Sequence, residues 1–274
     1  MRTVTLLFPD DCRLCTRPLR NLSRVPVCSS CLTSVSPLSS EHSCRLCQTP
    51  FVDAFPLDDQ GVCARCRRGE VGFDAAYCFG SYEASLRDLI RLFKYSQIES
   101  LAKPLGRMMV RAIPSHQRFD AVVPMPMHWY RRWRRGFNQA ELLAQPVARA
   151  YGLRVNHQLR RVRLGKVQAG LSGAERRTNL KNAFRVRNSE RLRGKRILLV
   201  DDVLTTGSTL HAASSALKAA GADYVAALTL ARVVRRGGVP DFSSRGSSRS
   251  EVSQFTSFEE QLRSVEYDGC GSTS

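Results

Sequence analysis

A run of acidic, hydroxyl and glycine residues follows a short apolar segment late in the chain. Residues 197–200 are apolar and are followed by the acidic pair Asp201 and Asp202, and then by the turn Thr205, Thr206, Gly207, Ser208 and Thr209. A glycine lets backbone N–H groups approach an anion closely, and a helix predicted to run on to about residue 220 adds unpaired N–H donors. The positive end of the helix dipole also favours an anion. The pattern predicts a phosphate site beside carboxylates suited to hydroxyls, a divalent cation or developing positive charge.

Two other phosphate-binding motifs do not fit this stretch. The P-loop requires a lysine directly after its second glycine, and no lysine follows Gly207. The dinucleotide motif G-x-G-x-x-G is absent here as well. The remaining alternative is an ordinary strand–turn–helix in which a threonine caps the helix and both aspartates are solvated.

Four apolar residues, two acidic residues and then TTGST resemble the phosphoribosyl pyrophosphate (PRPP) motif of type I phosphoribosyltransferases. The resemblance implies that Asp201 and Asp202 hold the ribose hydroxyls and stabilise positive charge at the reacting carbon. It implies that residues 205–209 cradle the 5′-phosphate and that PRPP binds with Mg²⁺. An earlier loop of that family contacts pyrophosphate, and this role is carried to Pro124, Met125 and Pro126. A proline-stiffened turn without a ligand is the alternative for that loop.

The first 70 residues contain eight cysteines arranged as four C-x-x-C pairs. Two such pairs complete a tetrahedral all-thiolate zinc site, so four pairs predict two structural zinc ions. Consecutive use assigns Cys12, Cys15, Cys28 and Cys31 to one ion, and Cys44, Cys47, Cys63 and Cys66 to the other. Interleaved use stays open. A disulfide framework needs an oxidising compartment, and a redox C-x-x-C would be a single motif.

Aromatic and arginine residues alternate around residue 130. Aromatic faces stack on single-stranded bases, and arginine binds phosphate and stacks on bases. The segment therefore predicts a surface for single-stranded DNA made by Trp129, Arg131, Arg132, Trp133 and Arg134. Two alternatives stay open: the arginines, Arg135 among them, bind pyrophosphate, or the indoles pack inside and the charges are solvated.

A second basic stretch, residues 159–184, contains Arg176 and Arg177 and several glycines. It is expected to form a mobile cationic loop that shields a pyrophosphate site from water, with both arginines as pyrophosphate contacts. The alternative is a charged, solvated surface loop with no role in ligand binding.

Composition sets wider limits. The chain has 274 residues, 43% of them hydrophobic, and a net charge of +18, which favours polyanionic partners or a soluble basic enzyme. No apolar run is long enough for a membrane span, and the first residues do not read as a signal peptide. The protein is expected to be cytoplasmic, with reduced thiols.

The elements around these motifs alternate between strand and helix. Strands are expected at residues 74–82, 121–123, 197–200 and 224–230, and helices at residues 85–93, 101–113, 137–150 and from after residue 209 to about 220. Ser85 and Asp88 resemble a capping box for the first helix. This order predicts an α/β fold with a parallel sheet and helices on both faces. The expected domains are residues 1–70, rich in cysteine, residues 71–234, and a disordered Ser/Gly-rich tail at residues 235–274.

Taken in order, the cysteine pairs, YEASLRDLIRLFKY, VPMP, RRGFNQAELLA, QAGLSGAERRTNLKNAF and LLVDDVLTTGSTL resemble the competence-protein ComF family. The resemblance covers about residues 12–234. It implies a double zinc ribbon joined to a type I phosphoribosyltransferase-like domain. It also implies a role in natural competence and in the uptake or use of single-stranded DNA. The implied partners are single-stranded DNA, a DNA-translocating motor protein, and PRPP or a related phosphorylated ligand. The alternative function is an active phosphoribosyltransferase of nucleotide metabolism that uses Mg-PRPP and an unknown acceptor.

Overall fold

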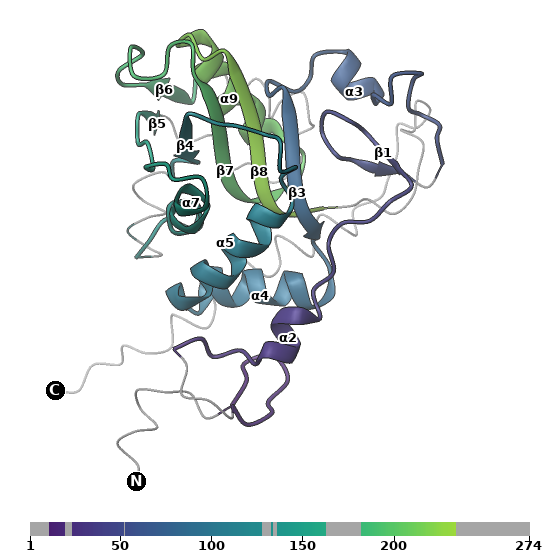
Figure 1. The fold of residues 1–274 in the computed structure, drawn as a ribbon, viewed down its shortest axis with the longest axis vertical. Coiled ribbons are helices and arrows are strands. Elements are labelled where there is room, and N and C mark those ends of the chain that lie inside the picture. The colour runs from purple at the N-terminus through teal and green to yellow at the C-terminus, as the bar shows by residue number, and fades with distance from the viewer. Residues whose placement is uncertain are drawn as a thin grey trace, which may run out of the picture.

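Four parallel strands form the central sheet of the protein (Figure 1). The structure is a computed structural model that describes residues 11–19, 24–51, 53–127, 133, 136–162 and 182–233. Across the sheet the strands are β3 (Ala75–Ser81), β8 (Tyr224–Arg232), β7 (Arg196–Leu204) and β4 (Ala121–Pro124). Because all four run the same way, the loops that follow them meet at one edge of the sheet. The predicted α/β class with a parallel sheet is confirmed.

Strand β7 shows why this sheet is buried on both faces. Successive side chains of a strand point to opposite faces. Ile197 and Leu199 belong to one apolar core, whereas Leu198 and Val200 belong to the other, and all four are inaccessible to solvent. Such a continuous apolar run is typical of a parallel strand covered by helices on both sides.

Helices cover both faces of the sheet. Apolar residues of three helices share one core with the sheet, and those of a fourth lie in the opposite core (Figure 1). The first group comprises α4 (Ala84–Tyr95), α5 (Ala102–Arg111), which follows the short 3-10 turn η1 (Glu99–Leu101), and α7 (Gln139–Ala150). The opposite face carries α9 (Ser208–Ala219).

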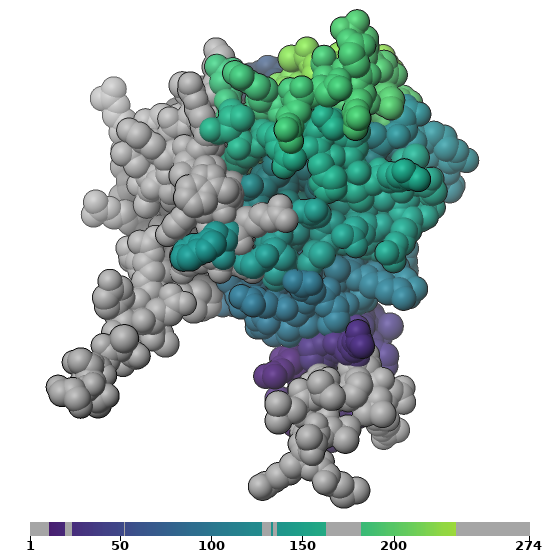
Figure 2. Space-filling view, turned by 90° about the vertical axis from the view of Figure 1, so that its left-hand side faces the viewer, coloured from purple at the N-terminus to yellow at the C-terminus, as the bar shows by residue number. Residues whose placement is uncertain are grey.

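The cysteine-rich part forms two small units that pack against different parts of this domain. The first cysteine segment, residues 11–19 and 24–35, contains α2 (Ser29–Thr33) and packs into the same core as α4 and α5. It lies below these helices in Figure 2, where it is purple. The second cysteine segment, residues 42–70, joins the core on the α9 face. It contains the antiparallel strands β1 (His42–Ser43) and β2 (Pro50–Phe51) and the helix α3 (Ala64–Arg67).

The outer edge of strand β3 is covered by the second cysteine segment and by the chain that joins the two cysteine segments. The Ala76 N–H donates to the Leu46 carbonyl at 2.7 Å, and the Cys78 N–H donates to Gln48 Oε1 at 2.8 Å. On the same strand, the Phe79 carbonyl accepts from the Leu38 N–H at 2.6 Å. These three polar backbone groups of the edge strand are therefore paired within the protein.

Three details differ from the expectations. Strand β7 extends to Leu204 because its pairing with β8 continues to the Leu204–Arg232 register, so the acidic pair lies inside the strand. Helix α4 begins at Ala84 with Glu83 at its N-cap and no side-chain capping bond, so the expected capping box is wrong.

The third difference concerns the stretch that was expected to be a loop. Its ends form an antiparallel pair, β5 (Leu159–Arg161) and β6 (Phe184–Val186). Residues 163–181 between them, and the expected tail at residues 235–274, lie outside the described residues. Within the described part, no helix is long and apolar enough to cross a membrane.

Candidate functional site

The acidic pair lies in the second half of β7 and has a lysine as a counterion. The Asp202 N–H donates to Asp201 Oδ1 at 2.9 Å, which fixes the first carboxylate against the backbone. Asp202 Oδ1 lies 2.8 Å from Lys94 Nζ, in the last turn of α4. The Lys94 and Asp202 side chains are only 16% and 15% exposed. A single ammonium group therefore faces two partly buried carboxylates.

The protonation of this cluster follows from its surroundings. Burial raises the pKa of Asp201 to about 7, and repulsion from the Asp202 carboxylate acts in the same direction. Burial alone would lower the pKa of Lys94, but attraction to Asp202 outweighs it and raises that pKa. Near neutral pH Asp201 is therefore partly protonated and partly ionised. Asp201 can then accept a hydrogen bond from a hydroxyl once it is ionised.

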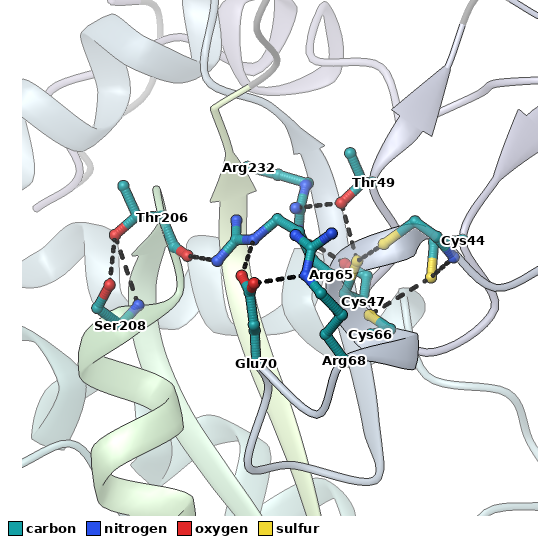
Figure 3. A network of polar contacts seen from close by, with 11 residues as sticks. Cys44, Cys47, Thr49, Arg65, Cys66, Arg68, Glu70, Thr206, Ser208 and Arg232 are labelled. Carbon is teal, nitrogen blue, oxygen red and sulfur yellow. Dashed lines mark hydrogen bonds and ion pairs between the residues drawn. The ribbon is translucent and has the colours of Figure 1, made fainter. Parts of the chain in front are cut away.

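The turn after β7 leads into α9 with a left-handed glycine at the helix N-cap. Gly207 has φ +76°, a conformation that costs little only without a Cβ. The Thr206 and Ser208 hydroxyls lie 3.0 Å apart (Figure 3). The Ser208 N–H reaches Thr206 Oγ1 only at 3.5 Å. Since Gly207 has no side chain to cap the helix, the first N–H groups of α9 suit an external anion.

The earlier loop of the expected pyrophosphate site lies next to the acidic pair. Pro124 is the last residue of β4 and is in register with Val200, directly before Asp201. The Met125 N–H donates to the Val200 carbonyl at 2.8 Å, and the Met125 carbonyl accepts from Asn138 Nδ2 at 3.1 Å. The backbone polar groups of Met125 are therefore already engaged, so a ligand at this loop must use other atoms.

Most of the expected arginine and tryptophan contacts cannot be placed. Trp129, Arg131, Arg132, Arg134, Arg135, Arg176 and Arg177 lie outside the described residues. Trp133 is described, and it is 79% exposed. The alternative in which this indole packs inside the protein is therefore wrong, whereas an exposed indole is available for stacking.

The eight cysteines form two groups, and in each group the sulfur atoms all lie within 4.8 Å of one another. The groups are Cys12, Cys15, Cys28 and Cys31, and Cys44, Cys47, Cys63 and Cys66, so the consecutive assignment is confirmed. Zinc–sulfur bonds of about 2.3 Å in a tetrahedron require sulfur atoms about 3.8 Å apart. The sulfur–sulfur distances are 3.9 Å for Cys12–Cys31, 3.7 Å for Cys15–Cys28, 3.6 Å for Cys44–Cys66 and 3.8 Å for Cys47–Cys63. Both groups therefore fit structural zinc.

Backbone donors support the thiolates that such a metal needs. The Cys28 N–H points at Cys12 Sγ from 3.3 Å, and the Cys63 N–H points at Cys44 Sγ from 3.4 Å. Hydrogen bonds from the thiols of Cys47, Cys63 and Cys66 hold the pKa of Cys44 well below its ordinary value. Four thiolates fill all positions of a tetrahedral zinc ion and leave none open for a substrate. This is typical of a structural ion and not of a catalytic one.

The second cysteine segment touches the phosphate turn directly (Figure 3). Arg65, which lies between the ligands Cys63 and Cys66, donates from Nη2 to the Thr206 carbonyl at 2.9 Å. Arg232, the last residue of β8, donates from Nη1 to the Cys47 carbonyl at 2.6 Å. Arg65 therefore links the candidate metal site to the candidate phosphate site, and Arg232 joins the metal site to the end of β8.

Sequence reasoning missed Lys94, Arg65 and Arg232 at this site. Lys94 had a local signal, because it directly follows Phe93, the last apolar residue of an expected amphipathic helix. Arg65 and Arg232 had none, since their partners lie 141 and 185 residues away in the sequence.

Two family models match the chain. A double zinc ribbon domain matches residues 3–68, and a phosphoribosyl transferase domain matches residues 135–263.

Three relatives illustrate the similarity, which extends over 62% to 84% of this chain. The chain is 36% identical to "Competence protein F" of Haemophilus influenzae over 178 residues, which are 62% of this chain and 78% of that protein. It is 32% identical to "DNA utilization protein YhgH" of Salmonella typhimurium over 237 residues, covering 84% of this chain and 100% of the relative. It is 28% identical to "Competence protein ComFC" of Bacillus subtilis, covering 84% of this chain and 88% of that protein.

Proposed function

Because the chain belongs to the competence-protein ComF family, we propose that it acts in the uptake or use of single-stranded DNA and binds PRPP with Mg²⁺ in its phosphoribosyltransferase-like domain. Relatives that align over most of their length are named for competence and for DNA utilisation, which supports the DNA-linked role. A fold alone does not fix an activity, which depends on the residues of the pocket.

One observation carries the PRPP assignment: the acidic pair and the open N-terminus of α9 belong to one strand–turn–helix. Hydroxyls of the ribose would donate to Asp201 and Asp202, while the 5′-phosphate would accept from the N–H groups of residues 207–209. Since Lys94 already pairs with Asp202, Mg²⁺ would be held mainly by oxygens of PRPP itself. The metal supplies charge neutralisation at the pyrophosphate.

Calorimetric titration of the zinc-loaded protein with Mg-PRPP tests this pocket. The double variant Asp201→Asn with Asp202→Asn should abolish saturable binding and leave the zinc content unchanged. A matched control is Asp59→Asn with Asp223→Asn, which removes the same charge at two exposed positions. If PRPP binding survives the first double change, the assignment of the ribose site is wrong.

The second candidate function is turnover at the same pocket. Carboxylates beside the ribose would stabilise positive charge at the anomeric carbon as pyrophosphate leaves. Arg135, Arg176 and Arg177 are proposed as pyrophosphate contacts on the basis of their place in the sequence. Pyrophosphate release, measured with and without single-stranded DNA, separates the candidates. Release that depends on DNA supports an enzyme of DNA processing, and saturable binding without release supports a sensing or regulatory pocket.

A further inference from the structure

We infer that Arg65 of the second cysteine segment is a positioning residue for the phosphate turn and sets the direction of the Gly207 N–H group. This inference rests on the proposed phosphate pocket. It extends the functional site beyond the phosphoribosyltransferase-like domain into the metal-binding part of the chain.

The guanidinium group of Arg65 is held on both sides. Its Nη2 donates to the Thr206 carbonyl at 2.9 Å, and its Nε donates to Glu70 Oε2 at 3.2 Å (Figure 3). The other oxygen of Glu70 accepts from Arg68 Nε at 2.8 Å. Because Arg68 holds Glu70 in place, Glu70 in turn orients the Arg65 guanidinium group toward the Thr206 carbonyl.

The peptide between Thr206 and Gly207 transmits this orientation. In a trans peptide the carbonyl oxygen and the following N–H point in opposite directions within one plane. A hydrogen bond that fixes the Thr206 carbonyl therefore also fixes the Gly207 N–H. Glycine explores more backbone conformations than any other residue, so this peptide gains most from an external restraint. A turn that is already ordered loses less entropy when an anion binds.

The second cysteine segment is itself anchored to the domain, so Arg65 acts from a fixed support. Arg232 donates to the Cys47 carbonyl and to Thr49 Oγ1. Two residues after the segment, Gly72 packs so closely on α9 that a Cβ there would lie 2.6 Å from the His211 carbonyl oxygen. Arg65 lies between two cysteine ligands, Cys63 and Cys66, so zinc in this site also restrains its backbone.

Two measurements on the full-length, zinc-loaded protein test the inference. Amide hydrogen exchange of residues 205–211 should be about tenfold faster in Arg65→Ala than in the wild type. Affinity for Mg-PRPP should fall about tenfold, with two zinc ions per chain retained. Arg65→Lys should restore part of the protection, because lysine can reach a carbonyl but cannot also present a fixed fork to Glu70.

The matched control is Arg67→Ala on the same helix. Arg67 contacts the Val62 carbonyl and Asp58, both inside the cysteine segment. Unchanged exchange of the turn in Arg65→Ala, or an equal change in Arg67→Ala, would overturn the inference. Faster exchange in a protein whose wild type binds no PRPP would uphold the positioning role and contradict only the proposed ligand.

A different observation points to a second site. We further infer that the β5–β6 pair and the groove beside it bind the phosphate backbone of single-stranded DNA, which rests on the proposed DNA-linked role. Arg160 and Arg185 face each other directly across these strands, and both are exposed. Like charges in this position destabilise a strand pair. Neither arginine has an acidic partner among the described residues, so a polyanion would relieve their repulsion.

A groove of about 370 Å³ continues this basic surface. Its charged lining comprises Arg154, His157, Arg191 and Lys195, together with one acidic residue, Asp120. Asp120 already accepts the Arg196 N–H at 2.8 Å. Arg196 begins β7 and Asp201 stands five residues further on, so the groove end of this surface lies about 16 Å along the strand from the acidic pair.

Fluorescence anisotropy with a labelled oligothymidylate at several salt concentrations tests this surface. Arg160→Gln with Arg185→Gln should reduce the slope of log affinity against log salt by about 1.4, or about 0.7 for each lost phosphate contact. The control, Arg107→Gln with Arg111→Gln, removes the same charge from exposed positions on α5. An unchanged slope, or an equal change in the control, would overturn this site. A wild type that binds no oligonucleotide would also overturn it, and with it the proposed DNA contact.

Discussion

Lys94 Nζ lies 2.8 Å from Asp202 Oδ1 and joins the last turn of α4 to the acidic pair of β7. The contact is mostly shielded from water, so its electrostatic energy is larger than that of a surface ion pair. It supplies a single positive charge for two neighbouring carboxylates. The pocket is thereby kept from accumulating a double negative charge that would repel an anionic ligand.

Replacing Lys94 by methionine should destabilise the protein, because Asp202 would then remain partly buried without its counterion. A loss of about 2 kcal/mol is expected, which corresponds to a fall of about 4–8 °C in melting temperature for a domain of this size. Thermal unfolding monitored by circular dichroism measures this fall. Lys103→Met, at an exposed position of α5, is the control. An equal shift in both variants would contradict a specific role for the ion pair.

Asp201 should make both stability and ligand binding depend on pH. Its pKa rises from 3.8 to about 7 in the folded protein, so the native state holds the proton more tightly than the unfolded chain. Stability is therefore lost as pH rises from about 4 to above 7. The variant Asp201→Asn lacks this pH dependence. Its melting temperature should therefore exceed that of the wild type by several degrees at pH 8 but not at pH 4.

Ionisation of Asp201 should strengthen ligand binding as pH rises, although it lowers the stability of the fold. A ribose hydroxyl donates to an ionised carboxylate, so affinity for Mg-PRPP should rise between pH 6 and pH 8 as Asp201 loses its proton. Calorimetry in buffers of different ionisation enthalpy should detect proton release on binding. Affinity that stays constant across this range would show that Asp201 does not contact the ligand.

Much of this fold could be predicted because its signals are local. The strand–turn–helix around Gly207 follows from an apolar run, a left-handed glycine and an alanine-rich segment that are contiguous in the sequence. The spacing of the cysteines predicted two four-cysteine sites with consecutive pairing as the simpler assignment, and the structure decides against the interleaved one. Periodicity likewise placed α4, α5 and α7 close to their observed positions.

What could not be predicted depends on partners that are distant in sequence. The apolar run ends at Val200, but β7 continues to Leu204 because β8 supplies partners for residues 201–204. The strands β5 and β6 have only three residues each, too few for a recognisable period, and they form by pairing with each other. The role of Arg65 depends on the docking of a cysteine segment against a turn 141 residues later, which no local pattern encodes.

The two metal sites should lose zinc at different rates. All four cysteines of the second site are buried, whereas three of the four in the first are partly exposed. A chelator with a coloured zinc complex should therefore show two phases of equal amplitude, the faster one belonging to the first site. Cys15→Ser should remove the fast phase and leave one zinc per chain. A single phase that releases two ions would contradict independent sites.

Trp133 should contribute to DNA binding and not to PRPP binding. Its indole is exposed and lies in an arginine-rich stretch, and stacking on a base is worth about 1–3 kcal/mol. Trp133→Ala should therefore weaken binding of a single-stranded oligonucleotide about 5- to 150-fold and leave PRPP affinity intact. Equal loss of both affinities would contradict separate sites.

The covered edge of β3 has a further consequence for the metal-free protein. Leu46 and Gln48 belong to the second cysteine segment, and they occupy N–H groups that would otherwise be open to another chain. An uncovered edge strand is a template for pairing between molecules. Loss of zinc from this segment should therefore convert a monodisperse protein into one that aggregates through its sheets. The second metal site then prevents self-association, whether or not the phosphate pocket is occupied.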